Sequence, residues 1–177
     1  TIMNVLKRAR ELSLQGVDLF ATPALSFFLK NKVKFGDFES NPEVLHQFSM
    51  LDDYDISASL KVWINNDDFI LSYLSQSLVN RKLFRIEIQN EPFKSDMVDE
   101  VRNKVMNKFG LDKSEVDYFV INEKTTNYTY KPGSGNISIL QKDGKIVDVI
   151  QATDELNISL LNKPTTKYFL SYPKLMS

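Results

Sequence analysis

The chain has 177 residues, enough for one large domain or two small ones with a real hydrophobic core. An apolar fraction of 42%, a charged fraction of 25% and a net charge of -1 describe an ordinary globular protein, with no global attraction to nucleic acid or anionic membranes. Because cysteine is absent, disulfides, thiolate metal ligands and cysteine nucleophiles are excluded, and a reducing, cytoplasmic location is expected. No apolar run reaches the roughly 18 residues of a membrane span, so we expect no membrane partner.

Helical patterns fill the first 80 residues. Apolar side chains recur at helical spacing from Ile2 to Leu12, and Gly16 is placed to end that helix. The pattern starts at Thr1 without a lead-in, which suggests that the sequence begins inside a longer protein. Thr22-Pro23 then predicts the start of a short apolar helix, because threonine is a common helix cap and proline a common first helical residue.

The next segment, residues 31 to 50, reads as a loop with a brief helix that begins at Asn41-Pro42. Two longer helices follow, whose apolar faces begin at Ile56 and at Ile70. The chain therefore has a helical part over residues 1–80.

A β-α-β-β-β lobe is predicted over residues 81–177, because the apolar pattern changes to alternation after Arg81. Its expected elements are a strand over 83–88, a helix over 95–109, a strand over 116–121, a hairpin over 137–150 and a last strand over 167–172. Asp143-Gly144 favours a type I′ turn in that hairpin, and residues 123–136 are expected to form a long loop. This grouping predicts the α+β class with a mainly antiparallel sheet.

Acidic clusters precede the two longer helices of the first part. One interpretation is a carboxylate-only Mg²⁺ site formed by Asp52, Asp53 and Asp67. The favoured interpretation is that these clusters, with Asp68, begin the two helices by accepting hydrogen bonds from free backbone N–H groups.

No catalytic constellation is visible in the chain. It has one histidine, His46, for which a packing or surface role is favoured over a catalytic one. There is no nucleophile motif, and Gly133-Ser-Gly135 lacks the Lys-Ser/Thr ending of a phosphate-binding loop. We therefore expect no catalytic residue and no metal ligand within these residues.

A basic cluster of Arg81, Lys82 and Arg85 lies where the helical part meets the first strand. Arg81 and Arg85 are four residues apart around Phe84, a spacing that would let them clamp a phosphate or carboxylate by bidentate hydrogen bonds. The alternative is a solvated face, or ion pairs with neighbouring acids (Asp67, Asp68 or Glu87).

The stretch LDDYDISASLKVW…DDFILSYLSQSLVNRKLFRIEI resembles the C-terminal region of bacterial HD-domain phosphohydrolases of the deoxynucleotide triphosphohydrolase (dGTPase-like) type. The preceding RARELSLQGVDLFATPALSFFL is similar to the helices that follow the catalytic core in that group. The final ATDELNIS…KPTTKYFLSYPK is similar to the group's C-terminal tail.

This resemblance implies a metal-dependent phosphohydrolase, in which a His…His-Asp…Asp quartet holds a divalent metal (Mn, Mg, Fe or Zn) and activates water. One histidine and no His-Asp pair are too few for that quartet, so we expect it upstream of Thr1, in an HD core that residues 1–80 extend. The 177 residues alone are expected to be inactive.

The resemblance also gives Arg81 and Arg85 a role, since they match basic residues that contact an activating nucleotide at a subunit interface in animal members of the group. It implies a (deoxy)nucleotide, a homo-oligomer and the upstream HD domain as partners. A non-enzymatic binding or oligomerisation module remains the alternative function.

Overall fold

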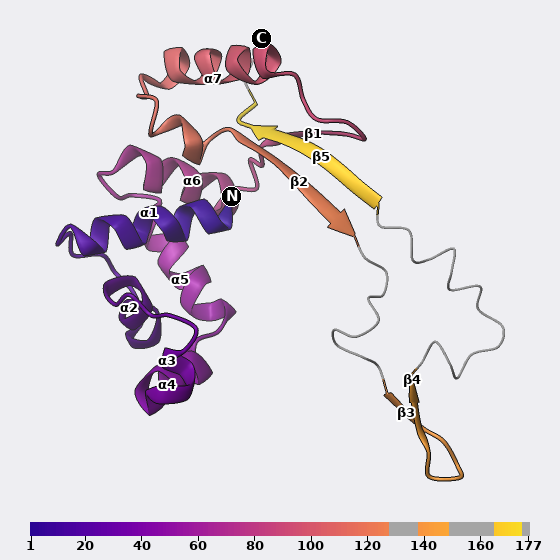
Figure 1. Ribbon diagram of the computed structural model, residues 1–177. Coiled ribbons are helices and arrows are strands. Elements are labelled where there is room, and N and C mark those ends of the chain that lie inside the picture. The colour runs from indigo at the N-terminus through magenta and orange to yellow at the C-terminus, as the bar shows by residue number, and fades with distance from the viewer. Residues whose placement is uncertain (128–137, 149–164, 175–177) are drawn as a thin grey trace. The chain divides into compact units, whose positions relative to one another are not determined.

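The computed structural model describes residues 1–127, 138–148 and 165–174 (Figure 1). Helices occupy the first part and antiparallel strands follow, so the predicted α+β class is confirmed. The described residues form two compact units. The first unit holds Thr1–Arg85, Asp99–Ile121 and the chain from Ser171, and the second holds Ile86–Val98 and Asn122–Leu170.

Six helices make up most of the first unit: α1 (Ile2–Leu14), α2 (Pro23–Lys30), α3 (Asp37–Ser40), α4 (Pro42–Met50), α5 (Asp53–Trp63) and α6 (Phe69–Val79). All the helices expected here are present, and α3 is an addition inside the predicted loop. Helix α1 packs against α2 and α6, and α5 packs against α6. The core of this unit includes Trp63, which is 1% exposed and whose indole N–H donates to the carbonyl of Phe20 at 2.9 Å.

The ends of these helices follow local signals in the sequence. Gly16 has a φ of +90° just after α1, in the left-handed region that glycine adopts without strain. Asn41 accepts the N–H of Glu43 at 3.0 Å and so caps α4. None of the helices in the described ranges is long and apolar enough to cross a membrane.

The strand predicted over 116–121 is wrong for residues 116–120. Helix α7 (Ser95–Phe109) is followed by a 3₁₀ turn, η1 (Val116–Tyr118), and strand β2 (Ile121–Asn127) begins only after it. The Asp112 carboxylate accepts the N–H of Glu115 at 2.9 Å and starts a helical turn there. The apolar residues of this turn and the two that follow it are therefore buried in the first unit, and Tyr118, Phe119 and Val120 are buried in succession instead of alternating along a strand (the fourth is Val116).

The second unit contains a three-stranded sheet in the order β1-β5-β2, with β5 (Thr165–Tyr172) between β1 (Arg85–Gln89) and β2. Strands β2 and β5 run in opposite directions (Figure 1), and the hydroxyls of Thr126 and Thr166 join them at 3.0 Å. Because β2 reaches Asn127, the loop predicted over 123–136 is wrong for residues 123–127. Residues 128–136 of that prediction lie outside the described residues.

The predicted hairpin is present as β3 (Ser138–Leu140) and β4 (Ile146–Asp148), which pair antiparallel; its ends at 137, 149 and 150 lie outside the described residues. Its turn is not type I′, because Gly144 has a positive φ and Asp143 does not. The Gly144 N–H donates to Gln141 O at 3.0 Å and the Gln141 N–H to Lys145 O at 2.8 Å, the pattern of a type I turn followed by a glycine bulge. Asp143 favours this turn because its carboxylate accepts the Lys145 N–H at 3.1 Å.

Candidate functional site

The basic segment, residues 81–85, follows directly from the end of α6. The Arg81 N–H donates to Leu78 O at 3.2 Å, and Arg81 has a φ of +55°. Among the described residues it is the only non-glycine residue with a positive φ. Helices commonly end on a glycine in this conformation, and a residue with a Cβ costs about 1 kcal/mol or more there. The chain therefore holds an arginine where glycine would be less strained.

Phe84 anchors the basic segment to the core of the first unit. Its ring is 8% exposed and stacks on Phe119, with centroids 6.5 Å apart and planes 16° apart. Phe119 is fully buried within a cluster of aromatic rings (Phe69, Tyr73 and Phe109). Arg81 and Arg85, on either side of Phe84, are exposed. The segment thus leads from the end of α6 to the first residue of β1 and is held by one buried ring, with an arginine on each side of it.

Asp68 does not pair with the basic segment, because Arg8 of α1 already holds it. Arg8 Nη2 lies 2.6 Å from Asp68 Oδ2, and Arg8 Nε lies 3.1 Å from Oδ1. Asp68 Oδ1 also accepts the Leu71 N–H at 2.8 Å, so Asp68 caps α6 as well. Burial alone would raise the pKa of Asp68, but the hydrogen bonds from Arg8 and the backbone hold that pKa below its usual value. Asp68 is therefore a structural residue.

Asp52 and Asp55 form a capping box at the start of α5. Asp52 Oδ1 accepts the N–H of Tyr54 at 2.7 Å and that of Asp55 at 3.3 Å, while Asp55 Oδ2 accepts the Asp52 N–H at 2.7 Å. Asp53 and Asp67 are exposed. Within the described ranges, no group of three or more His, Cys, Asp or Glu side chains is placed to hold a metal. The prediction that Asp52 and Asp68 begin helices is confirmed.

His46 is exposed on α4. It lines a hollow of about 270 Å³ in the first unit with residues of α2, α4 and α5, Asp55 among them. The hollow is lined by neither a second histidine nor a nucleophilic side chain, and the exposure of His46 fits the second of the two roles predicted for it, packing or surface.

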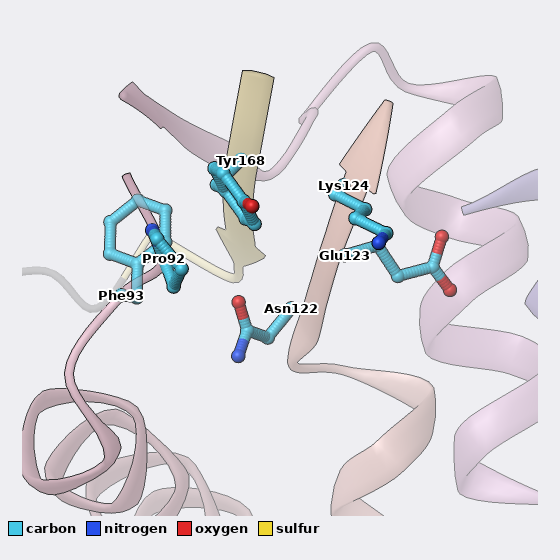
Figure 2. Close-up of a pocket in the computed structure, with 6 residues that line it drawn as sticks. All are labelled: Pro92, Phe93, Asn122, Glu123, Lys124 and Tyr168. Carbon is cyan, nitrogen blue, oxygen red and sulfur yellow. The ribbon is translucent and has the colours of Figure 1, made fainter. Parts of the chain in front are cut away.

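A pocket in the second unit was missed by sequence reasoning. It has a volume of about 470 Å³ and is lined by two residues from the loop after β1, three from β2 and one from β5 (Pro92, Phe93, Asn122, Glu123, Lys124 and Tyr168; Figure 2). Its volume is within the range of small-molecule sites. No local signal could have found it, because its walls are far apart in the sequence.

No model of a known protein family matches the chain, and no curated protein matches it. Among solved structures, a phosphohydrolase from Bacteroides thetaiotaomicron, determined at 2.20 Å resolution, is similar with 42% identity and a TM-score of 0.79. The match covers 98% of this chain and 43% of that protein, so the chain spans less than half of its relative's length. Over nearly its whole length, the chain is therefore related to one part of a phosphohydrolase.

Proposed function

We propose that the chain is the C-terminal part of a metal-dependent (deoxy)nucleotide phosphohydrolase of the HD type, and that it serves assembly or regulation. In this proposal residues 1–80 extend an upstream catalytic core, and residues 81–177 form the C-terminal lobe. The observation that carries the proposal is the 42% identity to a phosphohydrolase over 98% of the chain. The resemblance of its sequence to the dGTPase-like group supplies the finer substrate class.

The residues of this chain do not fit the metal that such an enzyme uses. An HD site takes two histidine and two aspartate ligands, and the chain has a single histidine, exposed on α4. Asp52 and Asp68 are engaged as helix caps. We therefore assign no catalytic step to these residues, and we place the metal site in a part of the polypeptide that precedes Thr1.

For the basic segment we propose contact with the phosphates of a regulatory (deoxy)nucleotide. Guanidinium groups recognise phosphate oxygens by bidentate hydrogen bonds and keep their charge at all physiological pH values. Both arginines are exposed, and Phe84 fixes the backbone between them. A strained backbone at Arg81 is consistent with a position retained for binding, since such strain often accompanies functional sites.

Turnover measurements test the reaction. Two proteins are assayed with Mn²⁺ or Mg²⁺ and a panel of deoxynucleoside triphosphates: the purified 177-residue chain, and the longer protein that includes the residues before Thr1. We expect release of phosphate or triphosphate by the longer protein and none by the 177-residue chain. Turnover by the shorter chain would overturn the placement of the metal site. Inactivity of both would instead favour the non-enzymatic binding or oligomerisation module.

A further inference from the structure

We propose that a groove on the first unit binds a fatty-acid-type ligand, which is an acyl chain that ends in a carboxylate. The groove has a volume of about 430 Å³ and is lined by α1, α2 and the chain around the start of α5. This volume is within the range of small-molecule sites. Apolar side chains make up most of its lining (Leu6, Leu25, Phe28, Leu29, Leu51 and Ile56).

Helix α1 contributes a second apolar stripe to this groove. One face of α1 is already buried in the core (Val5, Ala9 and Leu12). Met3, Leu6 and Arg10 follow one another at spacings of three and four residues, so they share another face of the helix. On the α2 side, Leu25 and Leu29 are only 3% and 4% exposed, whereas Met3 is 79% exposed. The groove therefore has a buried apolar floor and an accessible rim.

Arg10 supplies a fixed positive charge at the groove. Its Nη2 donates to Asn31 O at 2.9 Å, the one hydrogen bond that Arg10 makes among the described residues. The other N–H groups of the guanidinium remain available, and a guanidinium binds a carboxylate by two parallel hydrogen bonds. Lys7 also lines the groove, but its Nζ lies 5.0 Å from the centre of the Tyr118 ring. We therefore assign the ligand's carboxylate to Arg10.

The lining disfavours other classes of small molecule. No acidic side chain is among the described residues that line the groove, so a cationic ligand would find no counter-charge. A nucleotide would bury its ribose hydroxyls and base N–H groups against leucine side chains, where they would lose their hydrogen bonds. The arrangement fits an apolar chain with one anionic end.

This site goes beyond the proposed phosphohydrolase function and does not rest on it, because it needs neither a nucleotide nor a catalytic core. Calorimetric titration of sodium dodecanoate, below its micelle-forming concentration, into the 177-residue chain measures the binding. We expect one-to-one binding. Decanoate should bind roughly tenfold more weakly, because it buries two fewer methylene groups. Dodecyltrimethylammonium, which has the same chain and the opposite charge, should not bind.

Two variants locate the ligand in the groove. Arg10→Gln should weaken dodecanoate binding by roughly tenfold or more, because charge-assisted hydrogen bonds to the carboxylate are lost. Met3→Glu should also weaken it, since it adds a like charge at an exposed position of the rim. The matched control is Leu140→Glu on β3, where the leucine is 71% exposed, and it should bind like the wild type.

Dodecanoate that fails to bind, or that binds both groove variants as tightly as the wild type, would overturn the proposal. So would binding to the 177-residue chain that is lost in the longer protein with the residues before Thr1. In that case the polypeptide itself would cover the groove.

Discussion

Arg8 and Asp68, sixty positions apart in the sequence, form a bidentate ion pair that joins α1 to the start of α6. Both side chains are mostly buried, at 19% and 17% exposed. The same carboxylate caps α6, so a single aspartate serves the tertiary contact and the helix end.

Replacing Asp68 with alanine should therefore cost more than an ordinary cap. We expect the free energy of unfolding to fall by about 2–3 kcal/mol, because the cap is lost and the Arg8 guanidinium is left without its carboxylate. Urea denaturation at neutral pH measures the loss. The control is Asp67→Ala at the exposed neighbouring position, where we expect a change within about 0.5 kcal/mol.

The stability contributed by the Asp68 carboxylate depends on pH, because the pKa of Asp68 is lower in the folded chain than its usual value. Its contribution to stability is complete above the unfolded pKa of about 3.9 and is lost as the pH falls through the folded pKa. The gap between wild type and Asp68→Asn should therefore be constant at neutral pH and close in acid below about pH 4. A gap that persists unchanged in strong acid would contradict the ionised pair.

Disrupting the capping box at the start of α5 should lower stability by a smaller amount. Asp52→Ala should lower the free energy of unfolding by about 1 kcal/mol, the usual cost of removing an N-cap. Asp52→Asn should cost less, because the amide oxygen still accepts backbone N–H groups. If these aspartates instead held Mg²⁺, the ion would stabilise the wild type against heat and would not stabilise an Asp52→Asn/Asp53→Asn variant.

Arg81→Gly should make the protein more stable. Glycine adopts the φ of +55° without a Cβ clash, so we expect a gain of about 1 kcal/mol in the free energy of unfolding. Arg81→Ala keeps the Cβ and should give no such gain. The control, Lys82→Gly, changes a residue that lacks a positive φ and should be neutral or destabilising. A loss of stability in Arg81→Gly would mean that the side chain contributes more than the strain costs.

The stability that Tyr118 contributes to the first unit depends on pH in the alkaline range. Burial and its hydrogen bond to the Glu11 carboxylate raise the pKa of Tyr118 to about 12. Its contribution is present below the unfolded pKa of about 10 and is lost as the pH rises through 12. Tyr118→Phe should therefore be about 1–2 kcal/mol less stable at neutral pH, with the difference shrinking between pH 10 and 12.

Local sequence signals were enough to predict most of the helical part. Asp52 precedes an apolar helical pattern and Gly16 follows one, and each marks a helix end by chemistry that needs no distant partner. The apolar run after Asp112 misled the prediction, because consecutive burial in a turn and burial in a strand produce similar sequences. The hydrogen bonds of Asp112, and the Phe119 N–H that donates to Val116 O at 2.9 Å, distinguish the two.

Contacts between residues far apart in the chain could not be predicted from local sequence patterns. The sequence places Asp68 at a helix start, and nothing near it indicates that Arg8 is its partner. The pocket beside Tyr168 depends on which strands are neighbours, and strand order is a property of the folded chain. The exposure of Arg81 and Arg85 around a buried Phe84 fits the predicted basic cluster, but its ligand is still a prediction.

Calorimetric titration of deoxynucleoside triphosphates into the wild type and into Arg81→Ala/Arg85→Ala tests the central proposal most directly. Losing two guanidinium–phosphate contacts should weaken binding on the order of 100-fold. Lys61→Ala/Lys113→Ala removes the same charge from exposed positions elsewhere and should bind like the wild type. Equal affinities of wild type and the arginine double variant would contradict a nucleotide site at the basic segment, and weakening by Tyr168→Ala instead would locate it in the pocket of the second unit.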